Sequence, residues 1–390
     1  MDNVRFGVIG LGNMGSFHVE SFPSIKGATL AAICDASQKN LEEAGKKAPG
    51  AKRFGSYPEM LAIDAIDAIL IATPHVLHPD VAIAALDKGI HVLCEKPLAV
   101  TVRQGRAVVD AAARHPELKF GMMLQQRTMP LYRKLRELIV DGELGEISRI
   151  TWIVTDWFRT WAYYASGGWR ATWAGEGGGV LINQCPHNLD LIQWLTGLTP
   201  SQVTAVGFIG RTHPIEVEDE VSAILEYPSG AIGHFITSTG EAPGTNRLEI
   251  IGDRGRIVAE NDKLRFTRTR KSVRETRETS RDAFARMETW EIEVPHASTE
   301  LEGHKAVTQN FVNAILKGDP LIATGADGLR QLELGNSILM AALTRKPVEL
   351  PLESAAYDQF IADMTKTYGG RKTLKTDPNA SVNMAASFQR

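Results

Sequence analysis

Short runs of apolar and β-branched residues alternate with helix-like segments through the first third of the chain. The strand-like runs cover residues 4–9, 30–34, 68–72, 91–94 and 119–123. Helical patterns, several of them bounded by proline or glycine, cover residues 14–22, 79–88 and 101–114. Strands that alternate with helices predict a doubly wound parallel sheet of the α/β class, which binds its ligand at the carboxyl ends of the strands.

From about residue 147 the pattern changes to strand-like runs that few helices interrupt. These runs cover residues 147–155, 203–208, 221–226, 231–237, 248–251 and 256–259. Such a succession predicts an α+β domain built on a large, mostly antiparallel open sheet. We therefore expect a nucleotide-binding domain at residues 1–124, a substrate-binding domain at 125–370, and a polar tail at 371–390 that is either loose or crosses to another subunit.

Composition is that of an ordinary globular chain, with 390 residues, 43% apolar and 23% charged. The formal charge of −3 gives no reason to expect nucleic acid or an anionic membrane as partner. No apolar run approaches the roughly 18 residues of a membrane helix, and the first strand follows without a signal-type segment, so we expect a cytoplasmic protein. Cys34, Cys94 and Cys185 lie far apart, which argues against disulfides and against a metal site.

A glycine loop joins the first strand-like run to the first helix. Gly10 permits the tight turn, Gly12 lets the backbone approach a pyrophosphate, and Gly15 lets helix and strand pack closely. Asp35 lies 20 residues beyond Gly15, where a carboxylate accepts the ribose hydroxyls and repels a 2′-phosphate. The glycine pattern alone would also fit a surface turn, but its context predicts a dinucleotide site. NAD is favoured, and NADP stays open because residues 37–39 could accommodate a phosphate.

Glu95, Lys96 and Pro97 directly follow the strand-like run 91–94. Lys96 therefore lies at the carboxyl end of a strand, in the same region as the glycine loop, Asp35 and Thr73. An ammonium there is well placed to stabilise negative charge that develops on a substrate oxygen. The simpler alternative is a solvated surface lysine.

Four motifs in this chain resemble those of the Gfo/Idh/MocA family of nicotinamide-dependent oxidoreductases, which act mainly on sugars and cyclitols. They are Gly10-Leu-Gly-Asn-Met-Gly15, Ala72-Thr-Pro-His-x-x-His78, His91-Val-Leu-Cys-Glu-Lys-Pro-Leu98 and Gly177-Gly-Gly-Val-Leu-Ile-Asn183-x-x-x-His187-x-x-Asp190. The resemblance extends to about Pro351. It implies a Rossmann domain followed by an α+β domain, and homo-oligomer contacts (dimer or tetramer) through the outer face of the second sheet.

The resemblance also indicates the cofactor-binding residues. This predicted set comprises Gly10, Gly12, Asn13, Met14, Gly15, Asp35, Thr73, Pro74, His75, His78, Glu95, Lys96 and Gln126. At the nicotinamide amide the sequence does not choose between Gln126 and its neighbour Gln125.

Asn183 and His187 follow the glycine triplet, and we expect them on one helix that begins at or just after Gly179. A spacing of four places both on one face, which by the family pattern looks onto the nicotinamide. Imidazole titrates near neutrality, so we expect His187 to take the proton of a substrate hydroxyl. A packed structural histidine is the alternative. Asp190 either orients His187 or faces solvent.

Asn183 departs from the family pattern, because many members carry aspartate at this position. An amide cannot exchange a proton as a carboxylate does, so an aspartate-assisted relay is in doubt. The amide can still hold a substrate hydroxyl by donating and accepting hydrogen bonds. The predicted catalytic set is therefore Lys96, His187 and Asn183.

Five of the seven tryptophans lie within residues 152–173, together with two tyrosines and two arginines. Some of these rings are expected in the core, but the glycines at 167 and 168 indicate a loop, and loops rarely bury several aromatic rings. Aromatic faces stack on the C–H surfaces of sugars, and arginines bind hydroxyls or a carboxylate. The predicted substrate-binding set is Lys96, Trp157, Arg159, Tyr163, Trp169, Arg170, Asn183 and His187.

These patterns predict an NAD-dependent dehydrogenase that oxidises a secondary ring hydroxyl of a sugar, sugar derivative or inositol. Two alternatives stay open on the same fold: a glycosidase that uses NAD for transient oxidation, and a non-catalytic nucleotide-binding regulator. The basic stretch 263–286 is interpreted as a solvated insertion between strands, since acidic residues interrupt it. His304 begins a helix that returns to the first sheet and is a weaker candidate for substrate contact.

Overall fold

The computed structural model describes residues 2–377 and contains two sheets. The first has the order β3-β2-β1-β4-β5-β6, and all of its pairs are parallel. Its strands are β1 (Val4–Ile9), β2 (Ala28–Cys34), β3 (Lys52–Phe54), β4 (Ala68–Ile71), β5 (His91–Cys94) and β6 (Phe120–Met122). The predicted Rossmann architecture is confirmed. The edge strand β3 was not predicted, because a run of three residues with two exposed side chains has no apolar pattern.

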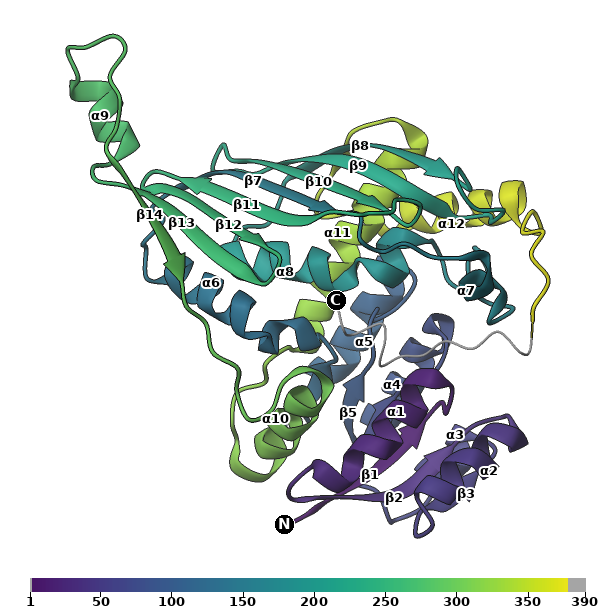
Figure 1. Cartoon of the computed structure of the whole chain (residues 1–390). Helices are drawn as coiled ribbons and strands as arrows, with labels where there is room; N and C mark the ends of the chain where they lie inside the picture. Colours follow the sequence, from purple (N-terminus) through teal and green to yellow (C-terminus); the bar gives the residue numbers. More distant parts are fainter. Residues whose placement is uncertain (1, 378–390) are drawn as a thin grey trace.

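Helices cover both faces of this sheet, as Figure 1 shows. They are α1 (Asn13–Ser21), α2 (Gln38–Lys47), α3 (Tyr57–Leu61), α4 (His78–Leu86), α5 (Val102–Ala113) and α10 (Gly303–Lys317). The helix α5 begins with a capping box, in which Thr101 and Gln104 exchange side-chain to backbone hydrogen bonds. The helix α10 comes from far along the chain, yet Phe311 packs against Phe6 of β1 with ring centroids 6.2 Å apart.

The second sheet has nine strands in the order β14-β13-β12-β11-β7-β10-β9-β8-β15, and only β7 and β10 pair in parallel. The strands are β7 (Ile147–Val154), β8 (Gln202–Ile209), β9 (Glu218–Glu226), β10 (Ile232–Ser238), β11 (Asn246–Gly252), β12 (Gly255–Glu260), β13 (Lys263–Thr269), β14 (Thr289–Val294) and β15 (Val348–Glu349). Buried and exposed side chains alternate along β8 and β9, so one face is covered and the other is open. The predicted open, mostly antiparallel sheet is confirmed.

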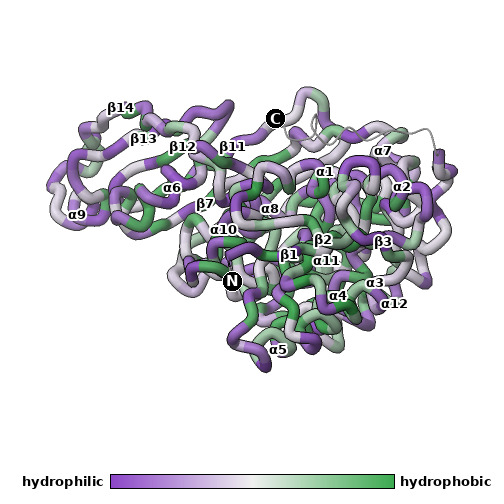
Figure 2. Tube along the Cα trace, turned by 90° about the horizontal axis from the view of Figure 1, so that it is seen from below, coloured by the Kyte–Doolittle hydropathy of each residue, from purple (hydrophilic) through white to green (hydrophobic). Residues whose placement is uncertain are grey.

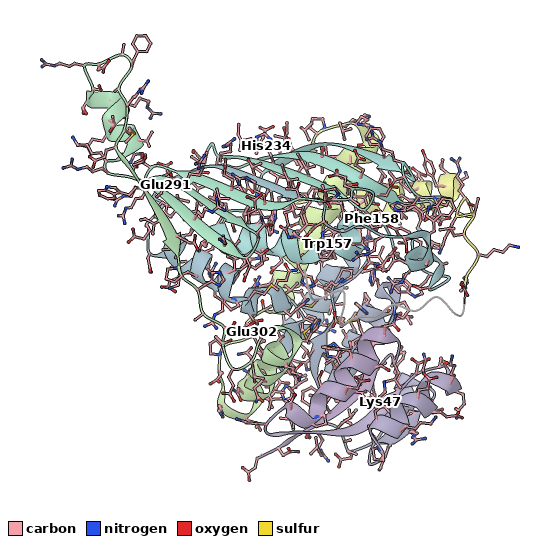
Figure 3. The ribbon with its side chains drawn as sticks, in the orientation of Figure 1. Lys47, Trp157, Phe158, His234, Glu291 and Glu302 are labelled. Carbon is pink, nitrogen blue, oxygen red and sulfur yellow. The ribbon has the colours of Figure 1, made fainter. Side chains whose placement is uncertain are left out.

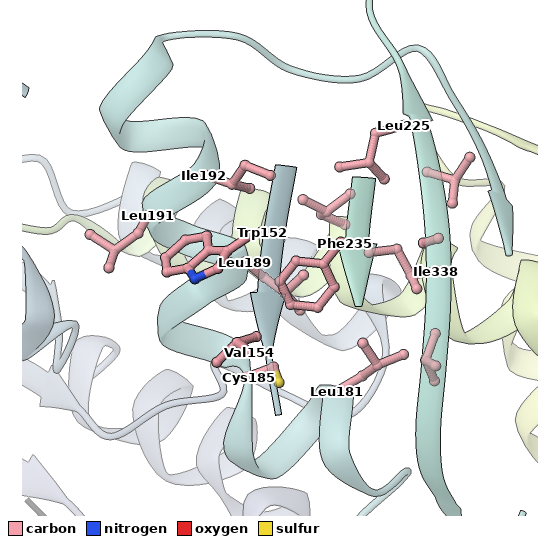
Figure 4. Packing of buried hydrophobic residues seen from close by; sticks show 14 of the residues in the cluster. Trp152, Val154, Leu181, Cys185, Leu189, Leu191, Ile192, Leu225, Phe235 and Ile338 are labelled. Carbon is pink, nitrogen blue, oxygen red and sulfur yellow. The ribbon is translucent and has the colours of Figure 1, made fainter. Parts of the chain in front are cut away.

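Helices lie under the covered face, between the two sheets (Figure 1). They are α6 (Pro130–Val140), α8 (Pro186–Thr196), α11 (Gly325–Thr344) and, at the far edge, α12 (Ser354–Tyr368). The core of this layer contains Trp152 and Phe235 from the sheet, Leu189 from α8 and Ile338 from α11, all fully buried (Figure 4). The helix α11 contacts both β8 and α5, and so it links the two layers.

The basic stretch 263–286 is more ordered than expected. Its first part is the strand β13, and the rest contains α9 (Val273–Thr279), which lies in an arm that extends away from the sheet (Figure 1). None of the α9 residues is buried, and Figure 2 shows this segment as predominantly hydrophilic. The expectation of a solvated insertion is therefore right for the arm and wrong for β13, whose alternate residues Leu264 and Phe266 are buried.

Two further expectations concern the surface and the end of the chain. Within residues 2–377, no helix combines the length and the apolar character needed to cross a bilayer. Of the predicted tail 371–390, residues 378–390 lie outside the described part. The remainder packs on the loop that precedes η4 (Val180–Gln184), since the Lys372 Nζ donates to the carbonyl oxygens of Gly167 and Arg170 at 3.2 and 2.8 Å.

Candidate active site

A cleft of about 820 Å³ lies between the two sheets, next to the carboxyl ends of β1, β2, β4 and β5. Both halves of the chain line it, and Figure 3 labels two of these residues, Trp157 below the large sheet and Glu302 at the start of α10. Every residue predicted for the site lines this cleft, with the exception of Gly15. The structure therefore brings together side chains that lie far apart in the sequence.

The glycine loop has the geometry of a dinucleotide cradle. Gly10 has φ +88°, and a Cβ on Gly15 would lie 1.7 Å from the Gly10 carbonyl oxygen, so Gly15 acts through packing, as predicted, and does not reach the cleft. A Cβ on Gly12 would meet no atom within 4 Å, so the space above this residue is open. The helix α1 begins at Asn13 without a side-chain cap, which leaves its first N–H groups available to a pyrophosphate.

Asp35 lies at the end of β2 and faces the cleft. Its carboxylate accepts hydrogen bonds from the backbone N–H groups of Leu11, at 2.6 Å, and Ser37, at 2.7 Å. It therefore also ties the glycine loop to the second strand, a role that the sequence did not indicate. The Asn40 side-chain amide also donates to this carboxylate, at 3.3 Å. A carboxylate has about four acceptor positions, so these three bonds leave capacity for a ribose hydroxyl.

Lys96 extends from the end of β5 towards the second layer, where its Nζ donates to the carbonyl oxygen of Asn183 at 2.8 Å. Burial lowers the pKa of Lys96, while the nearby Glu95 acts in the opposite direction. Glu95 accepts a hydrogen bond from His18 at 2.7 Å, and both side chains are buried. Burial alone would raise the pKa of Glu95, but His18, His304 and Lys96 lower it to about 2. A charged carboxylate thus lies directly behind the lysine.

The prediction of one helix through Asn183 and His187 is wrong. Asn183 lies on a short π-helical turn, η4 (Val180–Gln184), and His187 lies on the first turn of α8, which begins at Pro186. Proline has no N–H to donate, so it cannot continue the preceding turn but is well suited to the start of a helix. The two side chains still reach the same cleft, although not through a shared helical face.

His187 is buried, with 6% of its surface exposed. Burial, and next the charge of Lys96, hold the pKa of His187 well below 6.5, so the imidazole is neutral at physiological pH. Its Nδ1 has no hydrogen-bond partner among the residues that the structure describes. Because Nδ1 is buried, the ring nitrogen left to accept a proton from a molecule in the cleft is Nε2.

Glu176 is a residue of this site that sequence reasoning missed. It is 2% exposed and accepts hydrogen bonds from the Asn183 side-chain amide and from the backbone N–H of Ala171, the latter at 2.6 Å. Burial raises the pKa of Glu176, although these donors and Arg170 act against it. The amide of Asn183, predicted to hold substrate, is thus also bound within the protein. The one available signal was a glutamate between glycines, directly before the motif.

Glu218, at the start of β9, holds the other end of the same segment. Its carboxylate accepts the backbone N–H groups of Gly179, at 2.7 Å, and Leu181, at 3.0 Å. Burial raises the pKa of Glu218 to about 8, against the effect of these hydrogen bonds. Two buried glutamates therefore position η4, whose carbonyl receives Lys96.

Both expectations for Asp190 are wrong. It neither orients His187 nor faces solvent, because its carboxylate pairs with Arg127 through two hydrogen bonds of 2.8 and 2.5 Å. Burial raises the pKa of Asp190, and Arg127 counteracts this. Arg127 follows β6 and also lies 3.2 Å from Asp327 of α11. The pair connects the segment that follows β6 to α8, so the role of Asp190 is structural rather than chemical.

The aromatic cluster divides into core and cleft. Trp152 and Trp173 are buried, and Trp161 is 58% exposed outside the cleft. Trp157 and Trp169 line the cleft with Tyr163. The expectation that only part of the cluster is core is confirmed.

Two arginines lie among the rings of the cleft. The guanidinium of Arg170 is 4.8 Å from the ring centroid of Trp169 and 4.7 Å from that of Tyr163. The guanidinium of Arg159 is 4.9 Å from the ring of Tyr163 and 5.5 Å from that of Trp157. These guanidinium groups and aromatic rings together form one wall of the cleft. The rings can contact the C–H surface of a sugar, and the guanidinium groups can donate hydrogen bonds to its hydroxyl groups.

The cleft is also lined by a histidine that the sequence indicated only weakly, by two glutamines between which it did not choose, and by a predicted cofactor residue that joins the two layers. His304 lines it, and burial lowers the pKa of this histidine to about 4. Gln125 and Gln126 both line it, so the choice between them stays open. His75 connects the two layers, because its Nδ1 lies 3.4 Å from the Glu176 carbonyl oxygen and its ring contacts Trp169 edge to face at 5.3 Å.

Comparison with protein families agrees with this architecture. Residues 4–121 match the model of an oxidoreductase family with an NAD-binding Rossmann fold, and residues 132–258 match the Gfo/Idh/MocA C-terminal domain. The chain belongs to the Gfo/Idh/MocA family. The resemblance inferred from the four motifs is thereby confirmed, and the protein is an oxidoreductase with an NAD-binding domain.

Individual members of the Gfo/Idh/MocA family are similar over most of the chain. Myo-inositol 2-dehydrogenase from Thermotoga maritima is 24% identical over 358 residues, which is 89% of this chain and 98% of that protein. The 1,5-anhydro-D-fructose reductase of Ensifer adhaerens is 25% identical over 350 residues, 89% of this chain and 98% of that protein. The crystal structure of the WlbA dehydrogenase from Bordetella pertussis, in complex with NADH and UDP-GlcNAcA, superimposes with a TM-score of 0.75 and 28% identity, covering 90% of this chain and 100% of that one.

As in other Gfo/Idh/MocA proteins, the Rossmann half of this chain is the cofactor domain. The residues described above fit NAD, because the loop above Gly12 is open and Asp35 lies at the end of β2. When bound there, NAD supplies the acceptor or donor of a hydride. Lys96 and His187 reach the same cleft from the two layers, so the cofactor and the candidate acid–base groups share one cavity.

Proposed function

We propose that this protein oxidises a secondary hydroxyl group on the ring of a sugar, sugar derivative or inositol, with NAD as the acceptor of the hydride. The observation that supports this most directly is the 2.8 Å hydrogen bond from the Lys96 Nζ to the Asn183 carbonyl oxygen. This bond brings an ammonium from the Rossmann domain to the segment that also presents His187. An acid–base group and a cation at one cavity are what oxidation of an alcohol requires.

In this proposal, His187 accepts the proton of the substrate hydroxyl. Burial and Lys96 keep the imidazole neutral, and Nε2 takes the proton, because Nδ1 is buried away from the cleft. Lys96 stabilises the alkoxide as negative charge develops on its oxygen, in a cleft that excludes much of the solvent. Asn183 contributes its carbonyl oxygen to Lys96 and its amide to Glu176, and so it orients the cation.

The class of substrate is supported by the walls of the cleft and by the relatives. Trp157, Tyr163 and Trp169 offer faces of the kind on which sugar rings stack. The relatives named above are a dehydrogenase of myo-inositol and a reductase of 1,5-anhydro-D-fructose, and both spans cover nearly all of this chain. A polyol or sugar is therefore the expected small-molecule partner.

A screen of sugars and cyclitols tests this proposal, with the absorbance of reduced nicotinamide as the readout and NAD⁺ and NADP⁺ tried in parallel. We expect oxidation of at least one ring alcohol, faster with NAD⁺. On that substrate, Lys96→Ala and His187→Ala should each lower kcat by about 10³-fold or more while NADH binding persists. The surface variants Lys134→Ala and His115→Ala serve as controls and should keep full activity.

Two results would contradict the proposal. Retained turnover in both the Lys96 and the His187 variants would refute the roles of these residues. Cleavage of an aryl glycoside without added cofactor, together with no net oxidation of any polyol, would favour the glycosidase that uses NAD for transient oxidation.

We further infer that the protein is a cytoplasmic homo-oligomer that associates through the open face of the large sheet. Val206, Phe208, Ile224 and Ile232 are each 39–45% exposed on β8, β9 and β10, and an apolar face of this kind is typical of a contact surface. Light scattering coupled to gel filtration tests this inference. A monomer at micromolar concentration would contradict it.

A further inference from the structure

Arg159 and Arg170 differ from the other arginines near the interface of the two layers. Arg127 pairs with Asp190 at 2.5 Å, and Arg106 pairs with Glu333 at 2.7 Å. Neither Arg159 nor Arg170 has a carboxylate within 4 Å in the described part of the chain, although both line the cleft. Two guanidinium groups that line one cavity, contact the same Tyr163 ring and form no ion pair among residues 2–377 are suited to bind an anionic ligand.

The protein holds both side chains in place by contacts that leave donors unused. The Arg170 Nη1 donates to the Tyr163 hydroxyl at 2.9 Å, while the guanidinium plane contacts two aromatic rings. The Arg159 Nη1 donates to the carbonyl oxygen of Phe158 at 3.0 Å, and its Nε is buried with no partner within residues 2–377. An arginine has five N–H donors, so several remain for an acceptor in the cleft.

The backbone around these arginines is also anchored. The carbonyl oxygen of Arg159 faces the Nε2 of His213 at 2.9 Å, and the Nδ1 of His213 lies 3.0 Å from the buried carboxylate of Asp219. The carbonyl oxygen of Arg170 accepts a hydrogen bond from the Lys372 Nζ. Because the backbone is held on both sides, the guanidinium groups occupy defined positions before any ligand arrives.

Positive charge gathers at this end of the cleft. Arg170 and Arg159 both lower the pKa of Lys96, although burial is the larger cause. The acidic groups nearby are already engaged: Glu176 binds Asn183 and Ala171, and Asp156 accepts from Asn246 at 3.2 Å. Lys96 has the charged Glu95 behind it, whereas Arg159 and Arg170 face the cavity without an ion pair to any described residue, which favours a substrate with a negative group.

We propose that the substrate is a sugar acid, a uronate or aldonate whose carboxylate binds Arg170 and Arg159 while its reacting ring or chain hydroxyl lies at Lys96 and His187. This inference rests on the proposed function and names its substrate class. The guanidinium of Arg170 is planar and has N–H donors beyond the one bound to the Tyr163 hydroxyl, and paired N–H donors match the two oxygens of a carboxylate. Phosphate groups often bind to the free backbone N–H groups at a helix start, and in this protein those groups lie at the glycine loop. The anion at Arg170 and Arg159 is therefore assigned as a carboxylate.

The carboxylate takes no part in the chemistry. The C–H carbon that carries the hydroxyl loses a hydride to NAD⁺, the hydroxyl proton passes to His187, and the product is a keto acid. NADH and one proton balance the reaction. The arginines thus determine which substrate is held and which carbon faces the reacting groups.

Matched pairs of acid and neutral sugar test the inference on the full chain. D-glucuronate is compared with D-glucose, D-galacturonate with D-galactose, and gluconate with sorbitol, and glucose 6-phosphate forms a separate arm. We expect kcat/KM to be about 30-fold or more higher for at least one acid than for its neutral partner, because a charged hydrogen-bonded pair contributes on that scale. Arg170→Gln and Arg159→Gln should each lower this acid-to-neutral ratio by about tenfold, and Arg170→Lys by less.

The surface variant Arg133→Gln is the control and should keep both the ratio and the activity. Thermal melting and NADH binding show whether each variant is folded. If Arg170→Gln does not fold, Arg170→Lys takes its place in the test. A preference for neutral sugars, or an unchanged ratio in both glutamine variants, would overturn the sugar-acid inference and leave the dehydrogenase intact. A preference for glucose 6-phosphate would overturn the assignment of a carboxylate. Absence of oxidation with every compound would instead refute the proposed function.

Discussion

The glycine loop at the nucleotide end of the cleft is one short segment of the chain, whereas the contact that places Lys96 at the substrate end joins distant segments. The glycine loop spans six residues, and the geometry of its own backbone decides what it binds. Lys96 reaches its position through a contact with Asn183, which is 87 residues away. A local site tolerates change elsewhere in the fold, while an assembled site depends on every contact that brings its parts together.

The ion pair between Arg127 and Asp190 offers the largest expected effect, because it is buried and fixes α8, the helix that carries His187, to the segment after β6. Asp190→Ala leaves a buried guanidinium without its main partner, and we expect a loss of about 3–5 kcal/mol in the free energy of unfolding. Chemical denaturation measures this. The double variant Arg127→Met/Asp190→Leu removes both charges and should cost less than Asp190→Ala alone. Equal losses would show that the pair is not a coupled unit.

Two glycine substitutions distinguish packing from ligand space at the nucleotide end. A Cβ on Gly15 would overlap the Gly10 carbonyl oxygen, so Gly15→Ala should lower the free energy of unfolding by about 1–3 kcal/mol. A Cβ on Gly12 meets nothing, so Gly12→Ala should leave stability within about 0.5 kcal/mol while NADH affinity falls, since the methyl group enters the space of the cofactor. Thermal melts and NADH titration measure the two quantities. Full NADH affinity in Gly12→Ala would place the pyrophosphate elsewhere.

The pH dependence of activity tests the protonation states of His187 and Lys96 at the substrate end of the cleft. Burial and Lys96 hold the pKa of His187 well below 6.5, and protonated imidazole cannot accept a proton, so kcat/KM should stay level down through pH 6.5 and fall only below it. Burial lowers the pKa of Lys96 from 10.5, so activity should fall again, as the ammonium is lost, before pH 10.5. A pH–rate profile on the best substrate shows both limbs. An acid limb centred above pH 6.5 would contradict the burial of His187 in the working enzyme.

The smallest effect is expected from Lys372, which connects the end of the described chain to the loop that contains Gly167 and Arg170. Lys372→Met removes the hydrogen bonds to the carbonyl oxygens of Gly167 and Arg170, so Arg170 should be held less firmly. We expect KM for the substrate to rise about threefold with little change in kcat, the scale of one hydrogen bond. Steady-state kinetics measure this, with the exposed Lys375→Met as the control. An equal change in both variants would show that the effect comes from charge in general.

Much of the cofactor end could be predicted because its determinants are local. The order of strand, glycine loop and helix, and the distance to Asp35, are properties of neighbouring residues, and the structure has them as predicted. The alternation of strands also indicated both sheets. The strands β3, β13, β14 and β15 were missed. β3 and β15 are too short to show a pattern, β14 is almost entirely exposed, and β13 has only two buried residues among several charged ones.

The substrate end was predicted as a set of residues but not as an arrangement. The motif indicated that Asn183 and His187 reach one cavity, yet the break at Pro186, the π-helical turn and the buried carboxylates of Glu176 and Glu218 followed only from the fold. For Asp190 the sequence left open a contact with His187 or exposure to solvent, whereas in the fold its carboxylate pairs with Arg127.

The sequence by itself determined the two sheets, the dinucleotide loop, the family and the side chains available for chemistry, because strand periodicity, backbone freedom at glycine and residue type are properties of short segments. Only the tertiary structure decided which of those side chains are paired. Whether a buried charge meets an opposite charge, as Arg127 does, or faces an open cavity, as Arg159 and Arg170 do, depends on segments that meet only in the folded chain. Electrostatic energies depend on such distances and on burial, and neither can be read along a sequence.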